Sequence, residues 1–486
     1  MLPAMDHEPM ARLEIDGLRV FHVPRPGRTR AVLWFGVGHS DETFATRGVT
    51  HVVEHLAMTV PAAGKFERNA SVDRSRTAFW ASGRPEQVGA FLNDVVRGLG
   101  DLPVDRLGKE RSVIAAECAT LTFGPHEALL FRRFGNGTFG LGCFPDLGPR
   151  ATDADVVGEH VRRWFVRDNA VLTILGTMPE GLSLRLPDGR APERHYERML
   201  RGPGWVTGDA PDPALSFEVP EGVVSSLVLR AMSERLEREL RDERGLAYAV
   251  MPDVVRLAGE RRMVLQVAVA AAPGAGVEVA TALVDELHRR AREGVSPEEI
   301  AEDLEWFDAL EAEPEYDEWR LDRSAEMALL GLDWEPGHEG RATLEGVTRE
   351  ETAELVAASL DTALVIVPET PPEGFPVGPT NGCSMSTQLS TPVLKRRLMS
   401  RAPKGTLLGF DGSRLEYQDA DGDVHQVRLD ECVGVGIGTG KDAGGRLVFG
   451  RRGCHVWVHP SEYQGADRVV NAIDSAVPAA LRFELT

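Results

Sequence analysis

The apolar and polar residues of the first third of the chain alternate between strand-like and helix-like periods. Apolar residues at every second position predict paired strands within residues 12–38, and a β-rich segment follows at residues 71–82. The apolar run at residues 170–175 predicts a buried strand. Helical spacing of apolar residues predicts helices at residues 48–58, 85–99, 105–121 and 156–165. This mixture indicates an α+β domain.

A second stretch, from about residue 215 to residue 368, repeats the mixture over a similar length. Strands are expected at residues 250–255 and 263–270. Helices are expected at residues 225–241, 277–293 and 297–311. The weak internal symmetry suggests a duplicated domain.

Proline-rich and glycine-rich segments divide the chain further. Residues 177–215 predict a linker between the two α+β units, and residues 369–388 predict a second one. Beyond it come short strands and one closing helix at residues 464–476, which indicate a small barrel or sandwich similar in outline to pleckstrin-homology-like modules. The predicted division is 1–190, 205–370, a linker at 371–392, and a mostly-β domain at 393–486.

Composition narrows the classes of partner and compartment. The net charge of −21 argues against nucleic acid or an anionic membrane surface as a partner. No apolar stretch approaches the roughly 20 residues of a membrane span, and the N-terminus lacks the pattern of an export signal. The five cysteines are scattered and form no C-x-x-C pair, so neither a disulfide framework nor a cysteine zinc site is expected. These features predict a cytoplasmic protein.

The stretch from His51 to His55 carries the clearest chemistry. Its two histidines are four residues apart and therefore lie on one face of the predicted helix. Two neutral imidazoles so placed can bind one Zn²⁺, and Glu54 beside the second can reach a zinc-activated water. The H-x-x-E-H order is typical of inverzincins. A chain with 13 His and 75 Asp and Glu could contain these five residues by chance, so the surroundings decide.

A catalytic zinc site needs a third protein ligand, and Glu117 is the candidate. It lies 62 residues after His55 on a predicted helix, and Glu110 lies seven residues before it on the same face. The alternative is that both are ordinary helix residues, with Glu110 an exposed partner of Arg106 or Arg111.

These residues resemble the M16 zinc peptidases, the group of pitrilysin, insulinase and the mitochondrial processing peptidase. Residues 48–55 match the family pattern G-x-x-H-x-x-E-H. The resemblance implies that His51, His55 and Glu117 are the zinc ligands, that Glu110 supports them, and that the fold consists of two tandem LuxS-like α+β domains. The spacing between motif and helix is shorter than is usual in the family, and we place the deletion around residues 59–68.

Three further segments carry the resemblance, which spans roughly residues 10–368. Residues 165–176 resemble the strand that closes the first domain. Asn69 and Ala70, followed by Thr77-Ala-Phe-Trp, are similar to the family's active-site edge strand, which implies that they bind the substrate backbone. Leu240–Tyr248 matches L-R-x-x-x-G-L-A-Y, which implies that Arg241 and Tyr248 contact substrate and the tetrahedral intermediate.

The resulting prediction is a zinc-dependent endopeptidase that cleaves peptides or unfolded segments, with Glu54 as general base. Each chain supplies about half of the family's chamber, so a homodimer or a heterodimer with another M16-like chain is expected, with Arg241 and Tyr248 acting in trans. Two alternatives stay open: a non-catalytic M16-like subunit or peptide-binding module, and a processing protease for a precursor peptide recruited by the C-terminal domain.

Simpler interpretations of the accessory residues also stay open. Arg241 and Tyr248 could cap and pack a helix end, and Asn69 could be a turn residue. Asp73, Arg74 and Arg76 are expected to form a solvated face. A second metal site at Cys454, His455 and His459 is a weak possibility, since free strand histidines are commoner.

Overall fold

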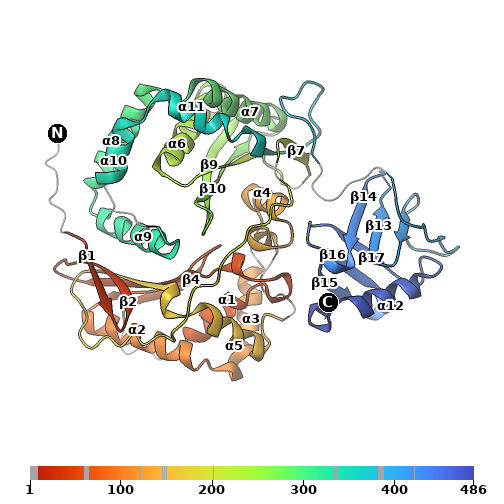
Figure 1. Ribbon diagram of the computed structural model, residues 1–486, viewed down its shortest axis with the longest axis horizontal. Coiled ribbons are helices and arrows are strands. Elements are labelled where there is room, and N and C mark those ends of the chain that lie inside the picture. Colours follow the sequence, from red (N-terminus) through yellow and green to blue (C-terminus); the bar gives the residue numbers. More distant parts are fainter. Residues whose placement is uncertain are drawn as a thin grey trace.

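The three largest hydrophobic cores of the described residues follow one another in the order of the sequence. The computed structural model describes residues 9–59, 65–119, 122–144, 146, 148, 150–200, 202–208, 210–332, 338–380, 388–420 and 422–485. One core gathers buried residues between Leu18 and Leu186, a second those between Leu215 and Val367, and a third those between Ala402 and Val477. Figure 1 shows the corresponding bodies, the first in red to yellow, the second in green to teal and the third in blue.

The first domain is a six-stranded sheet with helices on one face. Its strands lie in the order β1-β2-β6-β3-β5-β4, so β4 is an edge strand. The strands are β1 (Ala11–Ile15), β2 (Leu18–Val23), β3 (Thr29–Phe35), β4 (Glu67–Val72), β5 (Thr77–Gly83) and β6 (Ala170–Leu175). These helices are α1 (Val49–Ala57), α2 (Pro85–Gly100), α3 (Leu107–Cys118) and α5 (Ala154–Trp164), whereas α4 (Pro125–Phe134) packs against the sheet of the second domain.

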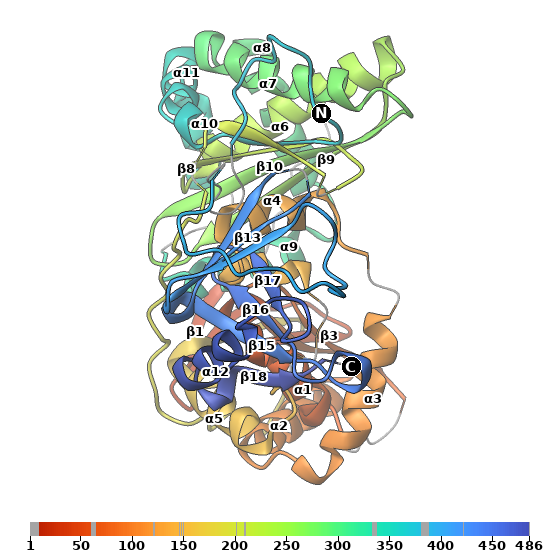
Figure 2. The same ribbon diagram turned by 90° about the vertical axis from the view of Figure 1, so that its right-hand side faces the viewer.

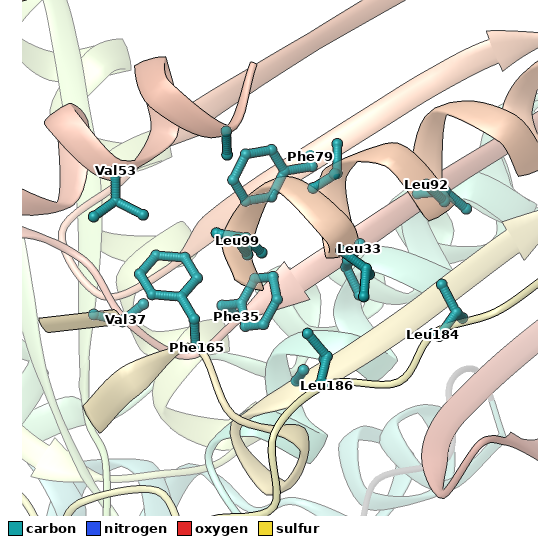
Figure 3. Packing of buried hydrophobic residues seen from close by; sticks show 14 of the residues in the cluster. Leu33, Phe35, Val37, Val53, Phe79, Leu92, Leu99, Phe165, Leu184 and Leu186 are labelled. Atoms are coloured by element: carbon teal, nitrogen blue, oxygen red, sulfur yellow. The ribbon is translucent and has the colours of Figure 1, made fainter. Parts of the chain in front are cut away.

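The core of the first domain fixes the motif helix against the sheet. Figure 3 shows Val53 of α1 in the same buried cluster as Phe35, Phe79 and Phe165. The rings of Phe35 and Phe165 lie 4.9 Å apart, within the range of favourable aromatic pairs. Because α1 buries its apolar side in this core, its opposite side can present polar residues to the cleft.

The second domain repeats the sheet with one strand fewer. Its order is β7-β11-β8-β10-β9, and each strand has a counterpart of the same relative direction in the first sheet. The strands are β7 (Gly204–Thr207), β8 (Ala214–Pro220), β9 (Ala247–Leu257), β10 (Arg262–Ala271) and β11 (Leu364–Val367). The helices are α6 (Val223–Glu237), α7 (Gly276–Glu293), α8 (Pro297–Glu311), α9 (Tyr316–Leu329), α10 (His338–Gly346) and α11 (Arg349–Ala357).

Helix α9 joins the two α+β domains. Leu321 and Ala325 of α9 form a small buried cluster with Phe21, Val23 and Val171 of the first sheet. In Figure 1, α9 lies on the side of that sheet opposite to α2 and α5. The second domain, through α9, therefore covers part of the face of the first sheet that lies opposite to α2 and α5.

The C-terminal domain is small and mostly β. A three-stranded sheet contains β12 (Leu407–Phe410), β13 (Arg414–Gln418) and β14 (Val424–Arg428). A four-stranded sheet contains β15 (Cys432–Ile437), β16 (Arg446–Gly450), β17 (His455–Val458) and β18 (Arg482–Glu484), and α12 (Ala466–Ala476) packs beside it. Figure 2 shows this domain from its outer side, in front of the first domain.

Several details differ from the sequence-based expectation. The β-rich segment is the hairpin β4–β5, because residues 73–76 form the turn between two paired strands. Residues 204–207, expected in a linker, form strand β7 because they pair with β11. Helices α4, α9, α10 and α11 had not been predicted, since charged residues dilute their apolar spacing. The turn is not a solvated face: Arg74 forms ion pairs with Glu127 (2.9 Å) and Asp253 (2.5 Å) and thus joins the two domains.

One expected helix is present but has different bounds. The helix expected at residues 225–241 begins at Val223 and continues as a π-helical segment over Arg238–Glu243. Cys383 lies outside the described residues. No helix in the described ranges is both long and apolar enough to cross a bilayer.

Candidate metal centre

A buried carboxylate prepares the start of helix α1. Gly48 precedes the helix with a φ of 88°, a conformation that favours glycine. The Glu42 carboxylate accepts hydrogen bonds from the backbone N–H groups of Gly48 (2.7 Å) and Thr50 (2.9 Å), two donors that the first turn leaves without helical partners. Arg47 adds an ion pair to Glu42 at 3.2 Å. The helix that carries the motif therefore begins at a fixed place.

Three donor atoms converge beside this helix. The Nε2 atoms of His51 and His55 lie 3.1 Å apart, and the Glu117 Oε2 atom lies 3.5 Å from the first and 3.4 Å from the second. A triangle with sides of this length surrounds a point about 2 Å from each corner, which is the usual distance of zinc from nitrogen and oxygen ligands. The three residues that were predicted as ligands therefore lie close enough to fit one zinc ion.

Outer hydrogen bonds orient both imidazoles. The His51 Nδ1 atom lies 2.6 Å from the Asp146 Oδ2 atom, and the His55 Nδ1 atom lies 3.3 Å from the Glu110 Oε2 atom. A Nδ1–H donated to a carboxylate leaves Nε2 with its lone pair toward the metal position. Each histidine thus has its own supporting carboxylate.

The two supporting carboxylates are held by arginines. Arg106 lies 3.1 Å from the Glu110 carboxylate, which is buried, so Glu110 is more than the exposed surface partner that was the alternative. Arg47 lies 2.5 Å from the Asp146 carboxylate. Sequence reasoning missed Asp146, because it lies 95 residues from His51 in a segment of irregular structure whose sequence carries no recognisable motif.

Burial and neighbouring charges shift the pKa values of His51 and Asp146. Burial opposes the charged form of His51, but the hydrogen bond and charge of Asp146, with smaller contributions from Glu54 and Glu117, raise its pKa overall. Burial acts against the Asp146 carboxylate, but His51 and Arg47 lower its pKa overall. The pair therefore behaves as a coupled carboxylate–imidazole unit.

Glu54 is placed for proton transfer and not for metal binding. Its Oε2 atom lies 3.8 Å from the Nε2 atoms of both histidines, farther than the Glu117 oxygen. Burial raises the pKa of Glu54 above that of an exposed glutamate, which makes its carboxylate a stronger proton acceptor.

An open cleft of about 850 Å³ lies over the three donors. The edge strand β4 contributes Asn69, Ala70, Ser71 and Val72 to its wall, and Phe123 and Phe144 contribute apolar surface. Asn69 belongs to a strand paired with β5, so it is not a turn residue.

The remaining predicted residues lie elsewhere. Arg241 is half-exposed and forms an ion pair with Glu237, whereas Tyr248 is 83% exposed near the start of the edge strand β9. Neither lines the cleft. Within the described part of the chain, Cys454, His455 and His459 form no metal-binding group; the other possible set, His51, Cys118 and Asp146, shares a residue with the first.

The C-terminal domain packs against the segment that leads to Asp146. Asn136 donates its backbone N–H to the Arg451 carbonyl and its side-chain N–H to the Gly450 carbonyl, both at 2.8 Å. The Phe44 ring lies 5.0 Å from Phe144 and 4.7 Å from Phe449. Since Phe144 lines the cleft, this contact connects the C-terminal domain to the wall of the site.

Comparisons with known sequences agree with these features. A family model described as the M16 peptidase inactive domain matches residues 180–304. A protein of Mycobacterium leprae named as an uncharacterized zinc protease is 27% identical over 335 residues, which are 58% of this chain and 74% of that protein. The Bacillus subtilis protein YmxG, also named as an uncharacterized zinc protease, is 25% identical over 260 residues, 45% of this chain and 63% of that protein.

Solved structures share the fold. A protease from Helicobacter pylori superposes with a TM-score of 0.61 at 14% identity and covers 75% of this chain and 100% of its own. The first half of the periplasmic protease PqqL from Escherichia coli gives 0.56 at 17% identity and covers 75% and 92%.

The chain combines two tandem α+β domains with a helix in the first that carries the H-x-x-E-H sequence. In sequence it is similar to proteins named as zinc proteases and, over residues 180–304, to the M16 inactive domain; in fold it is similar to M16 peptidase domains.

Proposed function

We propose that this chain is a zinc-dependent endopeptidase that cleaves peptides or unfolded segments at the centre on α1. The observation that carries the proposal is the convergence of His51, His55 and Glu117 within 3.5 Å of one another. Bound zinc supplies a Lewis acid that lowers the pKa of water and polarises a peptide carbonyl.

Glu54 performs the proton transfer in this proposal. Its carboxylate faces the same point as the three ligands and has a raised pKa, so it can take a proton from the attacking water and return it to the leaving amine. Asp146 and Glu110 hold the imidazoles in the tautomer that binds metal.

The substrate binds as an extended strand along β4. This strand is at the edge of its sheet, and Asn69 to Val72 line the cleft above the ligands. A peptide can therefore add to the sheet by β-augmentation, which uses backbone hydrogen bonds and makes little demand on sequence.

A second M16-like chain completes the site. Arg241 and Tyr248 lie outside the cleft of their own chain and are exposed, as residues that act in trans would be. The partner is a second copy or another M16-like chain. Mixing an inactive Glu54→Gln chain with an inactive Arg241→Ala chain should restore activity; dimers without restored activity would argue that the two residues do not act in trans.

The decisive experiment combines metal analysis with peptide cleavage. The purified chain should contain about one zinc per chain and cleave a peptide library in a chelator-sensitive way, whereas His51→Ala should lose both properties. A chain without zinc, which gains neither metal nor activity when zinc is added, would instead be a non-catalytic subunit.

Processing of a recruited precursor peptide is the second candidate. It rests on the presence of the extra domain, but deletion of residues 385–486 is not a clean test because it would uncover Phe44 and break the Asn136 contacts. Substitutions on the exposed surface of this domain are the better probe: they should reduce cleavage of a precursor while sparing a short generic peptide.

A further inference from the structure

One segment of the C-terminal domain takes no part in the proposed peptidase chemistry. Residues 391–405 contain five lysines and arginines and no acidic residue, although the net charge of the chain is −21. Four of the nine exposed large apolar side chains in the described residues lie in or next to this segment: Val393, Leu398, Met399 and Leu407. A cluster of positive charge and a cluster of exposed apolar side chains thus occur together in one segment of an acidic chain.

A hydrogen-bonded turn projects two of the apolar side chains. The Ser400 N–H donates to the Arg397 carbonyl at 3.2 Å, which places Leu398 and Met399 at the centre of the turn. Their relative exposures are 106% and 91%. Central turn positions usually carry Gly, Pro, Asn or Asp, so two adjacent large apolar residues there need a reason other than the turn itself.

The turn is built on a fixed base. The Arg397 backbone N–H donates to the Glu462 carbonyl (2.8 Å), and its guanidinium donates to the Pro460 carbonyl (2.9 Å). The Arg396 guanidinium donates to the carbonyls of Ser400 (3.3 Å) and Ala402. The Arg397 bonds tie the start of the turn to the segment before α12, and the Arg396 bonds join the two ends of the turn, so the projection of Leu398 and Met399 is part of the folded domain.

Positive charge surrounds this base. Lys395, Arg401 and Lys404 are exposed, and none of the ion pairs among the described residues involves them. Arg397 has Asp467 at 3.9 Å as its ionic partner. We call residues 395–404 the basic tip.

We propose that the basic tip binds an anionic membrane surface, with Leu398 and Met399 entering the headgroup region and the surrounding cations pairing with lipid phosphates. A convex turn offers no groove to a partner chain, whereas a lipid surface adapts to it, and basic residues beside exposed apolar ones are the combination that anionic interfaces bind. The net charge of −21 argued against an anionic surface for the chain as a whole. Charges farther than about 8 Å from the contact are largely screened at physiological salt, so the local positive charge of the basic tip governs the contact. This contact is independent of the proposed peptidase activity.

The test is sedimentation of the full chain with lipid vesicles. Binding is expected to vesicles that contain phosphatidylglycerol and not to vesicles of phosphatidylcholine alone. The double variant Leu398→Ser/Met399→Ser should weaken it about tenfold or more, and Lys395→Glu/Lys404→Glu to a similar degree. Val104→Ser removes an exposed apolar side chain from the first domain and should leave binding unchanged.

Several outcomes would overturn the proposal. Failure of the unaltered chain to sediment with phosphatidylglycerol vesicles is one, and equal binding by the Leu398→Ser/Met399→Ser variant is another. If vesicles are not bound and the same variant converts a dimer into a monomer in size-exclusion chromatography, the basic tip is a contact between copies of this acidic chain and not a membrane contact.

Discussion

The two α+β domains share one sheet order but join their corresponding helices in different ways. In the first domain, α1 and α3 bring His51, His55 and Glu117 together. In the second, the helices at the same places in the order, α6 and α8, are joined by Arg230 and Asp303, whose side chains make two hydrogen bonds of 2.5 and 2.8 Å. The family model of the inactive M16 domain matches this second region.

The two domains differ in the side chains that their corresponding helices carry, not in the arrangement of those helices. An arginine and a carboxylate satisfy each other's charge and geometry in a bidentate pair. Two imidazole nitrogens and a carboxylate oxygen at 3.1–3.5 Å from one another are the donor types and the spacing that suit a zinc ion. The same arrangement of helices therefore carries a candidate set of metal ligands in the first domain and an ion pair in the second.

The largest effect expected is on catalysis in the first domain. Glu54→Gln should lower the rate of peptide cleavage by about 10²–10⁴-fold, because it removes the proton acceptor and leaves the three ligands in place. Zinc content, measured by atomic absorption, should stay unchanged. Loss of zinc together with activity would show that Glu54 supports the metal site instead.

Breaking the ion pair of the second domain should affect stability and not metal binding. Arg230→Met leaves the buried Asp303 carboxylate without its partner and should reduce the free energy of unfolding by about 2–3 kcal/mol. Arg230→Met/Asp303→Leu should recover much of this loss, and urea unfolding measures both variants. Zinc bound per chain should match that of the unaltered protein; if it falls, the two domains are coupled more closely than their separate cores indicate.

The helix layer of the first domain should also respond to acid. Burial, with a smaller contribution from Arg163, lowers the pKa of His160 to about 3, and its Nε2 atom lies 3.0 Å from the Thr50 hydroxyl of α1. The unfolded chain binds this proton below pH about 6.5, so stability is lost as pH falls from there towards 3, by about 2 kcal/mol between pH 7 and pH 5. His160→Gln should flatten that slope in urea unfolding. An unchanged slope would assign the acid sensitivity to other groups.

The smallest effect concerns the contact between the first and C-terminal domains. Asn136→Ala removes one of the two N–H groups that donate to the Gly450 carbonyl, the other being the Gly453 N–H, and should cost about 1 kcal/mol of stability. Because residue 136 begins the segment that ends at Asp146, zinc affinity should also fall, by up to about tenfold. Glu197→Gln, which removes the exposed partner of Arg451, is the control and should change neither by much. Equal effects of both variants would show that the contact does not reach the metal site.

Local patterns were sufficient for part of the fold and most of the centre. The spacing of His51, Glu54 and His55 predicted one polar helix face, and the spacing of Glu110 and Glu117 predicted another, and the structure brings these faces together. The β-rich segment predicted at residues 71–82 belongs to the hairpin β4–β5, and Arg74 in its turn forms ion pairs with Glu127 and Asp253. Such contacts join residues far apart in the chain, and no periodicity reports them.

By itself, the sequence determined which residues can serve as metal ligands and which helix faces carry them, because positions three, four and seven apart in a helix lie together whatever surrounds the helix. Only the tertiary structure decided that Asp146 supports His51, that α9 covers the first sheet, and that the C-terminal domain packs beside the cleft. Those arrangements depend on contacts between segments that are distant in the chain. Such contacts form, and contribute to stability, only when the domains have folded against one another.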